Sequence, residues 1–210
     1  MKKFALLALL LTVGTVAGRA QESRQDVSIS GSTMLEPHVY GSTTVDVGAK
    51  RGLGALFSYR FMLTPRGAVE ANYAYSQNNI NYHSDAGGFP KGIQINTRTQ
   101  EVSAAYVYNF NFHKFNPFVE LGGGALLWGQ IRNLATTTVD AKGQTTIVGL
   151  YGGGIAYEIS PSFDIRVEYR GIVSKVPDFG LGTSGGNQPD LNTNKYYNIN
   201  NPVIGVAYHF

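Results

Sequence analysis

The sequence of 210 residues contains no cysteine and few charges. Without cysteine there is neither a disulfide-stapled small domain nor a thiolate metal site. Asp, Glu, Lys and Arg make up 15% of the chain, against about 25% in a typical soluble domain. Beyond residue 20, no apolar run approaches the roughly 18 residues that indicate a membrane-spanning helix. A helical membrane protein is therefore excluded.

The first 20 residues have the pattern of a secretory signal peptide. Lys2 and Lys3 open the chain, an apolar run covers residues 4–16, and small residues precede a cleavage point after Ala20. Three of the 17 basic residues lie in this segment, whereas all 14 acidic residues follow it. The exported chain would then carry no net charge, so its composition gives no support to nucleic-acid binding.

After residue 25 the apolar residues recur with a period of two, which predicts β-strands. The clearest run is 163–174, where one face carries Phe163, Ile165 and Val167 and the other carries charged residues. Similar runs predict eight strands in all, at 26–34, 51–63, 68–76, 101–110, 117–130, 145–159, 163–174 and 200–210.

The connections between these strands alternate in length. Short ones lie at 64–67, 113–116 and 160–162, and long polar ones at 35–50, 83–97, 132–144 and 176–199. In an antiparallel meander, all short turns then lie at one end and all long loops at the other, as in outer-membrane barrels. The pattern predicts an all-β fold: residues 21–210 form one eight-stranded antiparallel up-and-down transmembrane β-barrel.

Aromatic residues crowd the strand ends next to the short turns, which favours a membrane barrel over a soluble one. Such a cluster is typical of the interfacial girdle between hydrocarbon and headgroups. Its predicted members are Tyr59, Phe61, Tyr106, Tyr108, Phe110, Phe112, Phe115, Phe118, Tyr157, Phe163, Tyr208 and Phe210. A secreted soluble barrel, with Phe, Tyr and Val lining an apolar ligand site, remains an alternative, because its strands would show the same period of two.

If the apolar faces meet lipid, the opposite faces build a polar interior. An eight-stranded barrel is about wide enough to be filled by side chains. We expect ion pairs and hydrogen bonds among Arg60, Glu70, Glu101, Glu120, Glu158, Asp164, Arg166, Glu168 and Arg170. A structural network is the preferred interpretation, and a proton or ion path is the functional alternative. Glycine triplets at 122–124 and 152–154 would allow close packing around large interior side chains.

Several stretches carry a resemblance to a known family. They are A-A-Y-V-Y-N-F, P-F-V-E-L-G-G-G-A, Y-G-G-G-I-A-Y and V-E-Y-R-G, and the chain ends with Gly205, Tyr208 and Phe210 in its last strand. The chain resembles the small eight-stranded porin-family or OmpA-type outer-membrane barrels, also called opacity-type surface antigens, without a peptidoglycan-binding domain. The resemblance implies residence in the bacterial outer membrane, contact with its lipid, and recognition of those three C-terminal residues by the barrel-assembly machinery.

Motifs for catalysis or cofactor binding are weak. Gly52-Leu53-Gly54 lacks the third glycine of a dinucleotide fingerprint and lies in a strand. His38, His83, His113 and His209 show no metal-ligand spacing. His83-Ser84-Asp85 has the wrong spacing for a lipid A deacylase pair and is interpreted as a polar loop tip.

The leading hypothesis is a non-enzymatic outer-membrane barrel, without cofactor or metal, that serves envelope structure or surface interaction through its long loops. The extracellular partner of those loops is not identified by the sequence. A lipid-modifying outer-membrane enzyme and a narrow channel or transporter for small solutes remain alternatives.

Overall fold

The computed structural model describes residues 24–40, 45–49, 51–84, 93–133, 142–180 and 192–210. The predicted signal peptide, residues 1–20, lies outside these ranges. The described residues include no helix long and apolar enough to cross a membrane.

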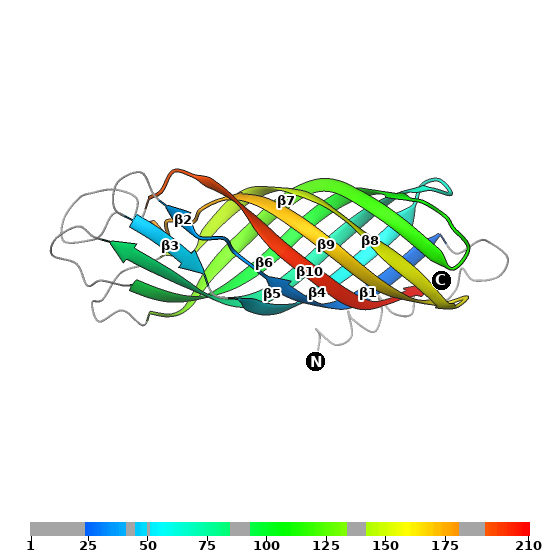
Figure 1. The fold of residues 1–210 in the computed structure, drawn as a ribbon, viewed down its shortest axis with the longest axis horizontal. Coiled ribbons are helices and arrows are strands. Elements are labelled where there is room, and N and C mark those ends of the chain that lie inside the picture. The colour runs from blue at the N-terminus through cyan, green and yellow to red at the C-terminus, as the bar shows by residue number, and fades with distance from the viewer. Residues whose placement is uncertain (1–23, 41–44, 50, 85–92, 134–141, 181–191) are drawn as a thin grey trace, which may run out of the picture.

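Every regular element of the described chain is a β-strand (Figure 1). The strands are β1 (Gln25–Met34), β2 (Val39–Tyr40), β3 (Val45–Ala49), β4 (Gly52–Met62), β5 (Gly67–Ser84), β6 (Ile93–Asn109), β7 (Phe115–Asn133), β8 (Gln144–Ser160), β9 (Phe163–Lys175) and β10 (Tyr196–His209).

Eight of these strands form a closed antiparallel barrel. β1 pairs with β4, each strand from β4 to β10 pairs with the next, and β10 returns to β1 through the register Asp26↔His209 to Ser32↔Val203. The predicted eight-stranded up-and-down barrel is therefore confirmed. The short strands β2 and β3 are additional: β3 pairs with the far end of β5, and β2 pairs with β3.

The short turns gather at one end of the barrel, which we call the inner end (Figure 1, right). In the turn between β4 and β5, the amides of Leu63 and Thr64 both donate to the carbonyl of Gly67 at 2.9 and 3.0 Å. The Gly67 amide donates to the Thr64 hydroxyl at 2.8 Å. The strand ends that the long connections join lie at the opposite, outer end.

Several strands extend further toward the outer end than the sequence predicts. β5 runs to Ser84 and β6 begins at Ile93, so the long loop predicted at 83–97 is too wide. An 18-residue strand tilted by about 45° gives roughly 40 Å of height at ~3.3 Å per residue, whereas the lipid-facing band of such barrels is about 25 Å tall. The outer part of the barrel therefore rises out of the hydrocarbon.

The two faces of β5 exchange character between the inner and outer ends. Near the inner end, β5 presents Val69 and Tyr73 outward and buries Glu70 and Asn72. Toward the outer end, the same strand buries Ile80 and Tyr82, while Asn79 and Asn81 occupy its half-exposed outward face. A wall with apolar residues outside suits lipid, and a wall with apolar residues inside suits water.

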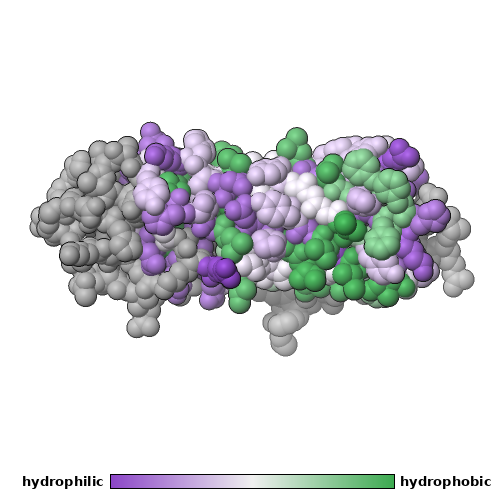
Figure 2. Space-filling model, viewed as in Figure 1, coloured by the Kyte–Doolittle hydropathy of each residue, from purple (hydrophilic) through white to green (hydrophobic). Residues whose placement is uncertain are grey.

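The outward side chains of the inner part form the expected apolar band. Large residues there remain exposed on the isolated chain, including Leu121 and Ile204, which are 71% and 62% exposed. Figure 2 shows apolar residues on one face of the barrel, mainly over the half nearest the short turns, with hydrophilic residues toward the other end.

The aromatic girdle is present at the inner end with one correction. Neighbouring rings pack as Phe115 with Tyr157 at 4.9 Å and Phe163 with Tyr208 at 5.0 Å between centroids. The prediction that Phe118 belongs to the girdle is wrong, because its side chain is 2% exposed and points into the barrel. It lies two residues before the buried Glu120, and side chains two apart on a strand share a face.

Candidate functional site

The lumen near the inner end holds a first ion-pair cluster built by four strands. Arg60 on β4 contacts Glu70 on β5, with 2.6 Å between Nη2 and Oε2. Arg166 on β9 reaches the same Glu70 oxygen at 3.4 Å and Asp26 on β1 at 3.2 Å. All four side chains are almost fully buried. Since two guanidiniums face two carboxylates, this inner cluster is neutral.

The ring of Phe118 on β7 packs against the two arginines of the inner cluster. The guanidinium carbons of Arg60 and Arg166 lie 4.7 and 5.6 Å from its ring centre. Both distances are within the range of a cation–π interaction, which is stronger where water is excluded. The ring therefore stabilises two buried cations besides filling space.

A second cluster lies around Arg170 on β9. Its Nη2 contacts Glu101 Oε1 on β6 at 2.6 Å, and its Nε lies 3.3 Å from Glu168 and 3.5 Å from Glu120. The side chain of Arg170 is fully buried, and those of the three glutamates are no more than 4% exposed. In this Arg170 cluster, one cation faces three carboxyl groups.

Glycine makes room for these charges on the inward face of the wall. A Cβ at Gly152 would stand 2.5 Å from Glu120 Oε1 and 2.6 Å from the carbonyl oxygen of Tyr169. A Cβ at Gly205 would collide with Ser30 and the backbone of Ile29. A side chain at either position would press on a neighbouring strand, and one at Gly152 would also press on the Arg170 cluster. The sequence predicted such close packing for the triplet at 152–154.

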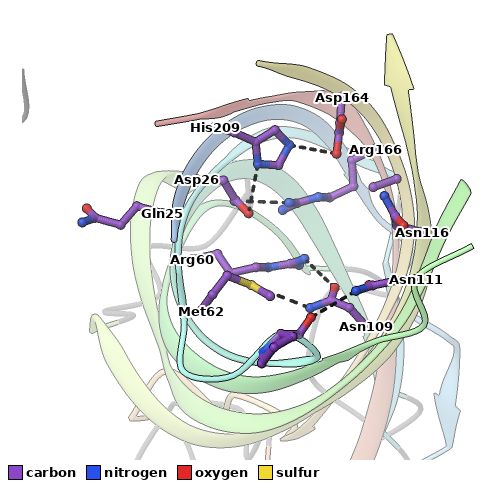
Figure 3. Close-up of a pocket in the computed structure, with 12 residues that line it drawn as sticks. Gln25, Asp26, Arg60, Met62, Asn109, Asn111, Asn116, Asp164, Arg166 and His209 are labelled. Atoms are coloured by element: carbon purple, nitrogen blue, oxygen red, sulfur yellow. Dashed lines mark hydrogen bonds and ion pairs between the residues drawn. The ribbon is translucent and has the colours of Figure 1, made fainter. Parts of the chain in front are cut away.

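The inner end opens into a polar cavity of about 150 Å³ (Figure 3). His209 lies between two carboxylates there: Nε2 is 2.9 Å from Asp164 Oδ2, and Nδ1 is 3.9 Å from Asp26 Oδ2. Figure 3 shows these side chains and Arg166 grouped on one side of the mouth, with Asn109 opposite. His209, which has no neighbouring histidine in the sequence, thus joins the interior charges at the seam between β10 and β1.

The outer part of the lumen is filled by apolar side chains, which we call the outer core. Every barrel strand except β4 contributes to its described members: Met34, Val39, Val47, Ile80, Tyr82, Ala105, Leu126, Trp128, Val148, Leu150, Ile172, Val176, Phe179, Tyr197 and Ile199. Ile80, Leu126, Ile172, Phe179 and Ile199 are fully buried. The predicted polar interior is therefore correct only for the inner part of the lumen.

The chain after β9 folds back over the outer core. Phe179 has a positive φ of 52° and is followed by Gly180 at 76°, a conformation that a bulky residue rarely adopts without support. The support comes from Gln144, whose Oε1 accepts the amides of Asp178 and Phe179 at 3.0 Å each. Tyr82 closes the other side by donating to the Pro177 carbonyl at 2.8 Å.

The nine predicted interior residues are not a single network. Six of them divide between the two clusters as Arg60, Glu70 and Arg166 and as Glu101, Glu120 and Arg170, and Glu168 joins the second. Asp164 pairs instead with His209. Glu158 is half-buried opposite Asp164 and takes part in no salt bridge among the described residues. Asp26 was missed, although its alternation with the buried Ser28 and Ser30 could have placed it inside.

The three C-terminal residues have different surroundings. Gly205 faces the lumen between β1 and β9, whereas Tyr208 and Phe210 are exposed on the outer surface, with their rings stacked at 6.0 Å. The Phe210 amide donates to the carbonyl of Gln25 at 3.0 Å, which fixes the chain end to β1.

The described residues contain no group of three or more His, Cys, Asp or Glu that could hold a metal ion. His83 and Ser84, predicted to lie in a loop, instead end β5 and pair through their backbones with Asp46 and Val45. Asp85 lies outside the described residues.

Comparison with known proteins identifies the family. The model of the outer membrane protein beta-barrel domain matches residues 5–210, so the chain belongs to this family. It resides in the bacterial outer membrane. No curated protein matches the sequence.

Two solved structures are similar to this barrel. Neisserial surface protein A is 14% identical with a TM-score of 0.58, and the match covers 90% of this chain and 98% of that one. OprG from Pseudomonas aeruginosa is 9% identical with a TM-score of 0.59, covering 91% and 98%. At these identities the likeness extends to the fold alone.

Proposed function

We propose that this chain is a non-enzymatic, non-conducting outer-membrane barrel that acts at the cell surface through its outer end. The observation that carries the proposal is a lumen filled along its length. The Arg170 and inner clusters occupy its inner part, and the outer core, with Trp128 and Phe179 no more than 2% exposed, occupies the rest. Such a barrel has a structural interior and leaves recognition to its outer surface.

The outer end has features suited to recognition. Tyr40 and Tyr196 are 67% and 71% exposed there, and Lys195 Nζ donates to the Tyr40 carbonyl at 2.7 Å, which joins β2 to the start of β10. Exposed tyrosines supply large contact areas at a small cost in conformational entropy. The stability of the barrel walls that carry them comes from the outer core, so this surface needs no support from lipid.

The surface role is tested by labelling intact cells with a membrane-impermeant amine reagent. Lys142 and Lys195 lie at the outer end and Lys114 at an inner turn, and all three are exposed. We expect modification of Lys142 and Lys195 in intact cells and of Lys114 only after lysis. Labelling of Lys114 in intact cells, with the other two protected, would contradict the proposed orientation.

The closed lumen is tested by planar-bilayer recordings. We expect no stable conductance from protein whose insertion is verified by a boiling-dependent mobility shift on the same sample. A stable, sizeable conductance would instead support a channel. The lipid-modifying alternative is tested by mass spectra of lipid A from cells with wild-type protein or a His83→Ala, Ser84→Ala variant. The two spectra should be identical, and a difference would indicate an enzyme.

A further inference from the structure

The buried charges of the inner lumen do not balance. Six carboxyl groups are no more than 5% exposed: Asp26, Glu70, Glu101, Glu120, Asp164 and Glu168. Arg60, Arg166 and Arg170 are the buried guanidiniums, and His209 is the partly exposed fourth basic group. An uncompensated buried carboxylate costs several kcal/mol, so a proton or another local group must reduce the excess.

The partners of each buried charge show that the excess carboxyl groups lie around Arg170. Arg60 and Arg166 are engaged by Glu70 and Asp26, and His209 is engaged by Asp164. Glu101, Glu120 and Glu168 are left with Arg170 as their nearest cation.

The nitrogens of the Arg170 guanidinium are shared unequally among the three glutamates. Both of its terminal nitrogens, Nη1 and Nη2, donate to Glu101, at 3.3 and 2.6 Å. Only Nε lies toward Glu120 and Glu168, and it carries a single hydrogen. One N–H therefore faces two carboxyl groups.

Glu120 is the least satisfied of these groups. Its side chain is fully buried, and neither of its carboxyl oxygens receives a hydrogen bond from the described residues. Glu168 Oε1 is also without a donor, and it lies 3.3 Å from the same Arg170 Nε that is 3.5 Å from Glu120 Oε1. Arg170 Nε completes a hydrogen bond with neither carboxyl group. Two adjacent carboxylates repel each other, and a proton between them relieves the repulsion and supplies a hydrogen bond.

We propose that Glu120 and Glu168 bind one proton between them, as a carboxylic acid hydrogen-bonded to a carboxylate, in the centre of the lumen. The acid supplies the donor that the second carboxylate lacks. The bound proton lowers the excess of the Arg170 cluster from two negative charges to one.

The surrounding strands supply no better cation for this pair. Arg60 on β4 and Arg166 on β9 influence Glu168 but are paired, and Glu70 on β5 adds further negative charge. At the same levels β8 contributes Gly152 and Gly154, and β10 contributes Asn201 and Val203, none of which is charged.

The bound proton makes stability depend on pH. The folded barrel holds one proton that the unfolded chain releases above the pKa of an ordinary glutamate, so stability falls as pH rises. While the pair keeps its proton, the ratio of folded to unfolded protein should fall tenfold per pH unit. Glu120→Gln, whose amide replaces the acid as donor, should remove this slope. Both proteins are compared in a Glu36→Gln background, because Glu36 also titrates.

Infrared spectroscopy of the full chain in lipid vesicles tests the proton directly. The reference is again the Glu36→Gln background, because Glu36 is a second buried carboxyl that holds a proton near pH 7. At pH 7 we expect a carbonyl band of a buried protonated carboxyl in this reference, lost on adding Glu120→Gln and retained on adding Glu158→Gln, the matched glutamate outside both clusters. Glu168→Gln serves as the second variant if Glu120→Gln does not fold. Absence of the band in the reference, or its persistence in both cluster variants, would overturn the proposal. So would stabilisation by sodium over choline without the band, because a metal cation would then be the neutralising group.

Discussion

Replacing Arg170 with methionine tests the energetics of the lumen most severely. The guanidinium is fully buried and contacts three glutamates within 3.5 Å. Its removal leaves the Glu101 carboxylate without a cation, and breaking a buried pair in this way costs about 3–5 kcal/mol. At ~1.4 kcal/mol per factor of ten, the ratio of folded to unfolded protein should fall by about 10²–10⁴.

The assay is urea unfolding in lipid vesicles at pH 8, followed by the mobility shift of the folded barrel. Arg98→Met removes an exposed arginine from β6 and should change the free energy of unfolding by no more than about 0.5 kcal/mol. Adding Glu101→Gln to Arg170→Met should recover part of the loss, because it removes the stranded charge. If Arg170→Met is as stable as Arg98→Met at pH 8, the cluster does not carry the charge balance described above.

Three further predictions address other parts of the barrel. Phe118→Ala should cost about 3–5 kcal/mol in urea unfolding, because it empties a buried site and removes two cation–π contacts, whereas Phe118→Leu should cost less. Burial raises the pKa of Glu36, in the connection after β1, to about 7. The stability contributed by protonated Glu36 is present below about pH 4.5 and is lost as the pH rises to about 7. Glu36→Gln should therefore stabilise the protein at pH 8 by up to about 3 kcal/mol and change its stability little at pH 4. Phe210→Ser should lower assembly in cells, measured by membrane fractionation, and leave the refolded barrel nearly as stable, because the ring lies on the outer surface; equal losses in both assays would make its role structural.

Strand faces in the inner part of the barrel could be predicted because lipid and a charged lumen impose opposite polarities on alternate residues. The same period also placed most interior charges correctly. Phe118 was misassigned because aromatic type was given more weight than its position, two residues from Glu120 on the same face.

The outer part could not be predicted in the same way. Toward the outer end of β5, Ile80 and Tyr82 point inward while Asn79 and Asn81 point outward. The pattern expected of a lipid-facing strand therefore ends before the strand does. The segment that carries Phe179 is rich in loop residues, and its burial depends on Gln144 from a different strand. Contacts of this kind follow from the closed barrel and leave no local signal.

The change from a charged inner lumen to an apolar outer core is the central claim, and Trp128 reports on it. It is the single tryptophan of the sequence, is 2% exposed within the outer core, and donates from Nε1 to Thr146 Oγ1 at 3.0 Å. The outward face of the same strand, β7, offers a control in Leu121, which is 71% exposed in the lipid-facing band.

The most direct measurement is fluorescence quenching of the folded protein in vesicles, by brominated lipid from the membrane and by iodide from water. The account predicts that Trp128 is shielded from both quenchers, whereas Leu121→Trp in a Trp128→Phe background is quenched by brominated lipid. Quenching of Trp128 by brominated lipid would place it on the lipid face, and quenching by iodide would show an open, hydrated lumen. Either result would contradict a barrel whose outer part encloses an apolar core.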